Sequence, residues 1–130
     1  MSKSGYHSSL FFLLFLVLPY LGFAQGKKDL KLAKKADKLM YSNQFDEAKS
    51  IYKDLVSRYP DNRDFNFYLG LCYYNSKVEI ENSLPYFEKA LSLSTVDTIG
   101  ENLLYQAKTL HFMGRFEEAI DYYNHFKDFV

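Results

Sequence analysis

The chain has 130 residues, 48% of them hydrophobic and 25% charged, which is typical of one globular domain and not of a disordered chain. Sixteen basic residues balance sixteen acidic ones, so the sequence lacks the excess of positive charge that nucleic-acid-binding domains carry. A single cysteine, Cys72, excludes an internal disulfide bond and a zinc site built from cysteines.

The first 24 residues have the three parts of a secretory signal peptide. Lys3 precedes an apolar run at residues 10–18, and Gly22 and Ala24 supply the small residues of a cleavage site before Gln25. The alternative is an uncleaved membrane anchor, but this run is much shorter than the roughly 20 residues that a spanning helix needs. We therefore expect export to the periplasm or outer membrane, or secretion, with a short linker at 25–28.

Six helices are predicted in the rest of the chain, and the fold class is all-α. Apolar residues recur at three- and four-residue steps, and no segment shows the sustained alternation of a strand. Pro60 follows the second helix, and Thr98 with Glu101 has the spacing of a capping box that would open the fifth. The predicted ranges are Asp29–Ser42, Phe45–Tyr59, Arg63–Asn75, Ser83–Leu93, Thr98 to about Phe112, and Phe116–Phe129.

The predicted helices fall into three pairs that repeat at a period of about 34 residues. Each unit has a small residue in both helices, followed by an aromatic residue in the second. Because two helices approach closely only at small side chains, the aromatic residues should fill the space between neighbouring pairs. Most of the twelve Tyr and twelve Phe, and Cys72 with them, are therefore expected in the core. The recurring positions are Ala36, Gly70 and Ala107, then Ala48, Ser83 and Ala119, and last Tyr52, Phe87 and Tyr123.

This combined pattern resembles the tetratricopeptide repeat family. The first unit carries Ala36, Leu39, Phe45, Ala48, Tyr52, Leu55 and Pro60; the second carries Gly70, Tyr73, Ser83, Phe87 and Ala90; the third carries Ala107, Leu110, Gly114, Phe116, Ala119 and Tyr123. The second unit departs from the pattern by one extra residue around 78–82 and by Thr95 in place of proline. The resemblance implies a right-handed solenoid of three antiparallel helix pairs, at about 29–62, 63–97 and 98–130.

The resemblance also implies a concave groove, formed by the first helix of each unit, that binds a peptide or helix of another protein. The groove positions of the family correspond here to Asp37, Met40, Tyr41, Phe67, Leu71, Tyr74, Asn75, Leu104, Lys108, His111 and Phe112. One subgroup of the family clamps C-terminal carboxylates with Lys, Asn and Arg. Ala33, Asp37, Tyr68 and Glu101 occupy those places in this chain, so such a ligand is not implied.

The last predicted helix carries Tyr122, Tyr123 and Phe126 and has no polar capping helix after it. This indicates either a partner that covers its face or the front of a longer protein. A signal peptide followed by three such units also resembles the N-terminal module of bacterial outer-membrane proteins that continue into a β-propeller and an OmpA-like domain. Some proteins of that kind serve secretion machinery.

The sequence holds no motif typical of a catalytic site or a phosphate-binding loop. Glu118, Asp121 and His125 share a helical face that could hold a metal, although a solvated face is the favoured interpretation and no cofactor is expected. A basic cluster of Lys27, Lys28, Lys31, Lys34, Lys35 and Lys38 is interpreted as a solubilising cap, or as a docking site for anionic lipid or an acidic partner.

Two functional hypotheses remain. The favoured one is a non-catalytic protein-interaction scaffold of the bacterial cell envelope, with no nucleic-acid partner and only an indirect link to the membrane. The alternative is a small ligand-binding protein or enzyme that uses His111 in the groove. A lone histidine without an acidic partner at a fixed spacing is weak support for general-base catalysis.

Overall fold

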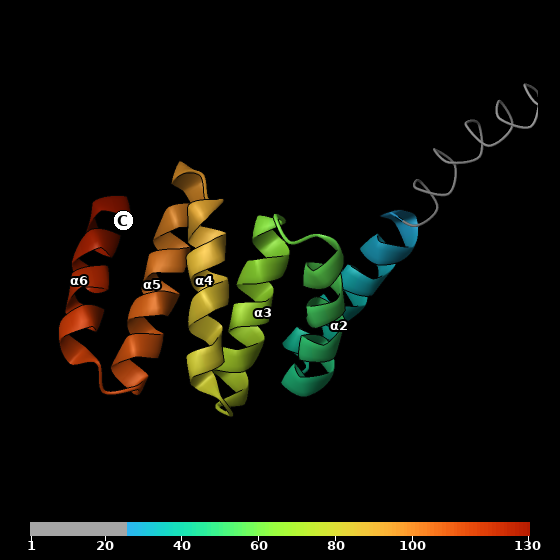
Figure 1. Cartoon of the computed structure of the whole chain (residues 1–130), viewed down its shortest axis with the longest axis horizontal. Coiled ribbons are helices and arrows are strands. Elements are labelled where there is room, and N and C mark those ends of the chain that lie inside the picture. The colour runs from blue at the N-terminus through green and yellow to red at the C-terminus, as the bar shows by residue number, and fades with distance from the viewer. Residues whose placement is uncertain (1–25) are drawn as a thin grey trace, which may run out of the picture.

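The computed structural model describes residues 26–130 (Figure 1), and all regular structure in this range is helical. A helix at 26–41, called the first helix below, comes before α2. Two short 3-10 turns, η1 (Ile80–Asn82) and η2 (Lys127–Phe129), accompany the α-helices. The α-helices after the first are α2 (Phe45–Arg58), α3 (Arg63–Ser76), α4 (Ser83–Ser92), α5 (Val96–Phe112) and α6 (Phe116–Phe126).

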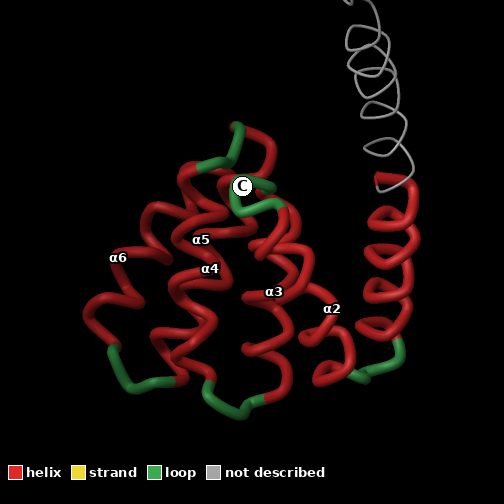
Figure 2. Tube along the Cα trace, turned by 45° about the vertical axis from the view of Figure 1, so that its right-hand side comes forward, coloured by secondary structure: helices red, strands yellow, loops and turns green. Residues whose placement is uncertain are grey.

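The helices lie side by side in chain order, from the first helix in blue to α6 in red (Figure 1). Short loops join them, and the chain reverses direction at each loop (Figure 2). The helix α3 packs on α4 and α5 packs on α6, while α2 contacts α3 and α4 contacts α5. The prediction of an all-α stack of three helix pairs is confirmed.

Small residues lie where the helices approach most closely, as the repeat pattern predicts. Ala36, Ala48, Ser83, Ala107 and Ala119 are all buried, and so is Gly70. A Cβ atom on Gly70 would lie 2.7 Å from the ring of Phe87. The backbone of α3 can therefore reach α4 at this distance only because the residue is glycine.

Aromatic side chains fill part of the space between the pairs, but most of the Tyr and Phe within residues 26–130 are half-buried or exposed, so the expectation that most lie in the core is wrong. Tyr52 and Phe87 are buried, and each contacts an aromatic residue of the following pair, Tyr68 and Tyr105 respectively. Cys72 is also buried, with its Sγ 3.2 Å from the Sδ of Met40. Burial raises the pKa of the Cys72 thiol to about 12, so the thiol stays protonated at neutral pH and acts as a packing group.

Three helix boundaries differ from the prediction by two or more residues. The fifth helix begins at Val96, because the capping box joins Thr95 and Thr98 in place of Thr98 and Glu101. The backbone N–H of Thr95 donates to the Thr98 Oγ1 at 3.0 Å. Residues 26–28, predicted as a linker, belong to the first helix, and the final helix changes to a 3-10 turn after Phe126.

The predicted signal peptide lies outside the described residues, so its presence stays a prediction. Among residues 26–130, no helix combines the length and the apolar character that crossing a membrane requires.

Candidate functional site

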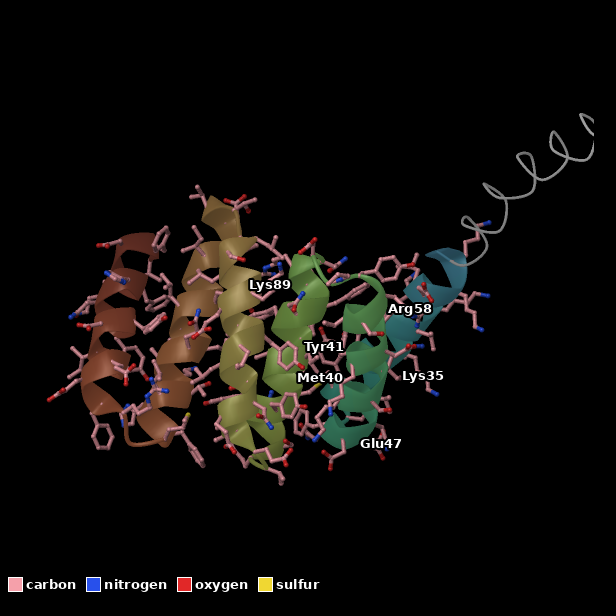
Figure 3. All side chains as sticks on the ribbon, in the orientation of Figure 1. Lys35, Met40, Tyr41, Glu47, Arg58 and Lys89 are labelled. Carbon is pink, nitrogen blue, oxygen red and sulfur yellow. The ribbon has the colours of Figure 1, made fainter. Side chains whose placement is uncertain are left out.

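A hollow of about 380 Å³ lies between the first helix and α3. Five of the eleven predicted groove residues line it: Asp37, Met40, Tyr41, Leu71 and Asn75. Figure 3 shows Met40 and Tyr41 directed toward α3, while Lys35 points away from it. The structure thus brings the predicted residues of the first unit together with two residues from the second.

Asp37 is held in the wall of this hollow by a residue from the next helix. The hydroxyl of Tyr52, a buried residue of α2, donates a hydrogen bond to the Asp37 carboxylate. The Tyr52 ring stacks on Tyr68 with 5.6 Å between ring centroids. Burial, together with the hydrogen bond and charge of Asp37, raises the pKa of Tyr52 far above its usual range, so Tyr52 remains a donor.

Three further residues line the hollow that were not among the predicted groove positions: Asn43, Phe45 and Tyr68. Asn43 lies in the turn before α2 with a φ of 57°, a left-handed conformation that asparagine tolerates. Phe45 opens α2, where the sequence pattern assigned it a packing role. Tyr68 stands at a position that the carboxylate-binding subgroup of the family uses for its clamp. That correspondence could have identified Tyr68 as a groove residue from the sequence.

Phe67 requires a correction, because it does not present a surface to a ligand. Its side chain is 1% exposed, and its ring packs against Tyr68, Phe87 and Tyr105 at centroid distances of 5.8, 5.7 and 5.8 Å. Adjacent residues on a helix point about 100° apart, so the exposed neighbour Tyr68 takes the surface position that was assigned to Phe67. Phe67 is therefore a core residue that packs against the exposed Tyr68.

Three other predicted groove residues, Tyr74, Lys108 and Phe112, take part in lysine–aromatic contacts. The Nζ of Lys77, at the end of α3, lies 3.7 Å from the Tyr74 ring centroid and 5.1 Å from that of Phe112. Lys108 lies over Tyr105 at 5.1 Å. The contact between Lys77 and Phe112 links the end of α3 to α5, and burial lowers the pKa of Lys77 below its usual value.

Leu104 lies apart from both groups and lines a second hollow of about 740 Å³ beside the chain's last residues, including Phe126, Phe129 and Val130. The predicted groove residues therefore lie at several separate places and not in one trough.

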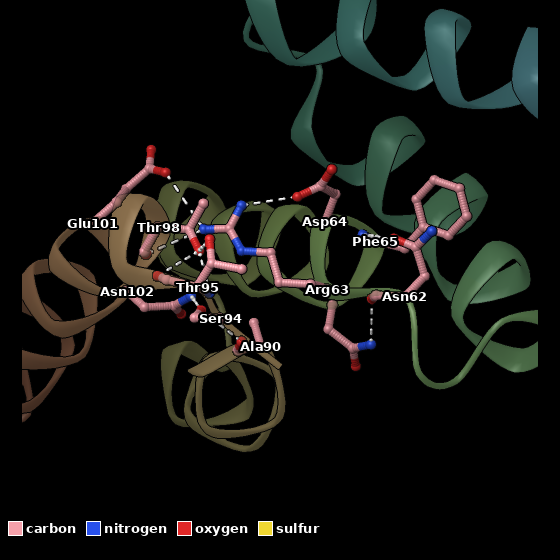
Figure 4. Close-up of polar contacts among 11 residues, drawn as sticks. Asn62, Arg63, Asp64, Phe65, Ala90, Ser94, Thr95, Thr98, Glu101 and Asn102 are labelled. Atoms are coloured by element: carbon pink, nitrogen blue, oxygen red, sulfur yellow. Dashed lines mark hydrogen bonds and ion pairs between the residues drawn. The ribbon is translucent and has the colours of Figure 1, made fainter. Parts of the chain in front are cut away.

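Arg63, at the start of α3, joins the second helix pair to the start of α5 (Figure 4). Its guanidinium contacts the carboxylates of Asp64 at 2.8 Å and Glu101 at 3.6 Å, and donates to the backbone oxygen of Thr98 at 3.4 Å. It also lies 4.7 Å from the Phe67 ring centroid. One cation thus partly neutralises two carboxylates near Tyr68.

Comparison with known families identifies the helix pairs. Two family models, both described as tetratricopeptide repeat, match residues 34–97 and 106–127. The chain contains tetratricopeptide repeats. The sequence is also similar to the TPR repeat-containing protein MJ0263 of Methanocaldococcus jannaschii, at 28% identity over 86 residues. That match covers 64% of this chain and 27% of the relative, so this chain corresponds to about a quarter of that protein.

The predicted metal-ligand candidates lie on the last tetratricopeptide helix, α6. Glu118 is bound there by Arg115, whose Nε and Nη2 donate to the two carboxylate oxygens at 2.7 and 2.6 Å. Asp121 and His125 are exposed. Within residues 26–130, no three His, Cys, Asp or Glu residues are placed to hold a metal ion together.

His111, the residue of the alternative catalytic hypothesis, is exposed at the end of α5. Its ring meets Phe116 and Tyr123 edge-on, with centroids 5.3 and 6.3 Å away. These contacts place it in an aromatic cluster between α5 and α6, outside both hollows. Tetratricopeptide repeats are generally a non-catalytic interaction fold.

The lysines of the first helix are exposed, and at 100° per residue they fall on one side of the helix, within an arc of about 120°. At the same end, Asp29 is buried and accepts hydrogen bonds from Arg58 and, at 2.6 Å, from the hydroxyl of Tyr59. Asp29, a buried acidic residue among these lysines, therefore fixes the first helix to the end of α2.

The apolar side of α6 is less buried than the corresponding sides of α2 and α4. Tyr123 and Phe126 are half-buried, whereas the corresponding Tyr52, Leu55, Phe87 and Ala90 are buried. Phe116 and Ile120 are 57% and 55% exposed. The described residues leave this apolar surface of α6 uncovered, and its role as a docking surface stays a prediction.

Proposed function

We propose that this chain is a non-catalytic scaffold that binds a peptide or helix of another protein in the hollow between the first helix and α3. Tetratricopeptide repeats generally mediate contacts between proteins. The observation that carries the assignment to this hollow is Tyr41, which lines it with 90% of its side chain exposed.

An aromatic ring this exposed gains much from being covered by a partner. Tyrosine is enriched among the residues that dominate binding energy at interfaces, because it buries a large rigid ring and keeps a polar hydroxyl. The other lining residues combine the apolar Met40 and Leu71 with the polar Asn43 and Asn75. Such a mixture of apolar surface and a few polar groups suits an extended peptide or the face of a helix.

The setting of this function is also a proposal: the cell envelope of a bacterium, with a role as an assembly module of an outer-membrane, peptidoglycan-associated or secretion-system protein. Its support is the signal-peptide pattern of residues 1–24. Intact mass of the protein recovered after export tests it. We expect a mature chain that begins at Gln25, and retention of residues 1–24 would contradict the proposal.

Site-specific photo-crosslinking tests the docking surface. A benzophenone side chain is introduced in place of Tyr41 and, as a control, in place of the exposed Ile120 on α6. In envelope extracts, position 41 should crosslink to one discrete protein and position 120 should not. Crosslinks from position 120 with none from position 41 would move the docking surface to α6.

A further inference from the structure

The hollow beside the first helix has one charged group in its lining. Of the eight described residues that line it, Asp37 is charged, and none of the others is Lys, Arg or His. The exposed Lys34 and Lys38 lie on the same helix but do not line the hollow. A ligand group that enters here therefore meets a carboxylate, two tyrosine rings and the apolar side chains of Met40 and Leu71.

The Asp37 carboxylate is oriented before any ligand arrives. One of its oxygens accepts the hydrogen bond from Tyr52, and Tyr52 is fixed by burial and by its stack on Tyr68. Tyr68 and Tyr41 also line the hollow, so aromatic rings accompany this carboxylate. Carboxylates and aromatic faces are the two kinds of group that attract an ammonium or guanidinium ion.

Two carboxylates besides that of Asp37 make the electrostatic environment of Tyr68 negative. Burial, and then the charges of Asp37, Asp64 and Glu101, raise the pKa of the Tyr68 hydroxyl. These carboxylates come from the first helix, α3 and α5. Arg63 contacts Asp64 and Glu101 but does not line the hollow, so it leaves the Asp37 side of Tyr68 uncompensated. Lys77 and Lys108 contact the rings of Tyr74, Phe112 and Tyr105, which do not line this hollow.

From this arrangement we propose that the hollow receives a lysine or arginine side chain of the bound segment, with its cation on Asp37 and its stem against Tyr41 and Tyr68. The proposal rests on the proposed function, since it names the ligand chemistry of the same site. Long basic side chains suit such a place because their methylene stems cover apolar surface while the charged end reaches a polar partner. A carboxylate ligand would instead meet Asp37 and be repelled.

A peptide selection on the full chain tests this specificity. The probe is a phage-displayed library of random twelve-residue peptides, selected against the wild-type protein and against Asp37→Asn. Asparagine keeps an oxygen acceptor for Tyr52 and removes the charge. Asp121→Asn on α6 removes the same charge from an exposed position away from the hollow and is the matched control.

We expect peptides selected by the wild type and by Asp121→Asn to share a Lys or Arg at one position, and those selected by Asp37→Asn to lack it. For one such peptide, Asp37→Asn and replacement of the peptide's basic residue by norleucine should each weaken binding about tenfold, with little further loss when combined.

Three outcomes would overturn the proposal. Selected peptides that need Tyr41 but show no basic residue would refute the ligand class and leave the proposed function standing. A basic preference that survives Asp37→Asn would likewise refute the role of Asp37. If no peptide binds in a way that Tyr41→Ala abolishes, the proposed function fails, and this inference fails with it.

Discussion

Gly70 shows how a single residue sets the distance between two helices. The Phe87 ring, fully buried in α4, lies where the Cβ of any other residue would have to go. Because the ring is enclosed on all sides, it cannot move away at low cost. The sequence pattern identified this position as small, and the contact explains why.

We predict that Gly70→Ala lowers the free energy of unfolding by about 1–3 kcal/mol, because overpacking a filled core forces side chains and backbone apart. Gly26→Ala is the matched control, since nothing lies within 4 Å of the Cβ it would add. Chemical denaturation of both variants measures the difference. Equal stability for wild type and Gly70→Ala would contradict the helix spacing described above.

The ionisation of Asp29 should make the free energy of unfolding depend on pH. The hydrogen bond from Tyr59 is the largest influence on its carboxyl, burial opposes it, and Arg58 adds to it; together they lower the pKa below its ordinary value of 3.8. A carboxyl with a lowered pKa stabilises the folded chain above that ordinary value. This contribution is lost as pH falls through the folded pKa.

In Asp29→Asn we therefore expect a lower free energy of unfolding than wild type at pH 7, and a difference that narrows once pH falls below about 3.8. Urea denaturation between pH 7 and pH 3 measures this difference. Asp121→Asn on α6 controls for the change in net charge. A difference between wild type and Asp29→Asn that does not change with pH would show that the carboxylate does not act through its charge.

The start of α5 shows what a helix boundary depends on. Thr95 and Thr98 form the capping box, whereas the sequence offered Thr98 and Glu101 as a pair with the same spacing. Both pairs have the spacing of the motif, but Thr98 stands where the motif has Glu or Gln, so the sequence favoured the other pair. Glu101 instead reaches Arg63 on α3.

Removing the hydroxyl of Thr98 should weaken this helix start. Thr98→Val keeps the shape of the side chain but leaves the backbone N–H of Thr95 without its acceptor, at a cost of about 1 kcal/mol. Glu101→Gln, at the residue that the motif alone would choose, should change stability by less than about 0.5 kcal/mol. Thermal unfolding of the two variants measures both changes in stability. A larger loss of stability in Glu101→Gln than in Thr98→Val would contradict a cap made by Thr95 and Thr98.

The six helices and the buried small residues could be predicted because helical periodicity and the repeat are local properties of the sequence. The site could be predicted only in part. Asp37, Met40 and Tyr41 line the hollow as expected, but Phe67 and Tyr68 exchange roles. Adjacent aromatic residues are interchangeable in a periodicity argument, and packing against Phe87 and Tyr105 determines which one is buried.

Lys77, which the sequence pattern did not single out, was missed for a different reason. Lys77 follows α3 in a left-handed conformation with a φ of 58°, and its side chain lies over Tyr74 and Phe112. The loop after α3 contains the extra residue of the second unit, so the repeat pattern gave no register for it. A contact of this kind follows from three-dimensional packing alone.

At the scale of the whole molecule, the helix pairs form a linear stack in which each pair packs on its neighbours. Repeat proteins of this kind gain stability from contacts within units and between adjacent units. In such a stack, residues from neighbouring units can line one hollow. In this chain the first two units supply the hollow with the exposed Tyr41, and α6 supplies a separate exposed aromatic residue, Phe116.

The affinity of the crosslinked partner for two matched variants tests the central claim most directly. Tyr41→Ala and Phe116→Ala each remove one exposed ring, the first from the hollow and the second from α6. By titration calorimetry, Tyr41→Ala should weaken binding by about 2 kcal/mol without lowering the melting temperature, and Phe116→Ala should bind like wild type. Full affinity in Tyr41→Ala, with the loss in Phe116→Ala instead, would contradict a docking site between the first helix and α3.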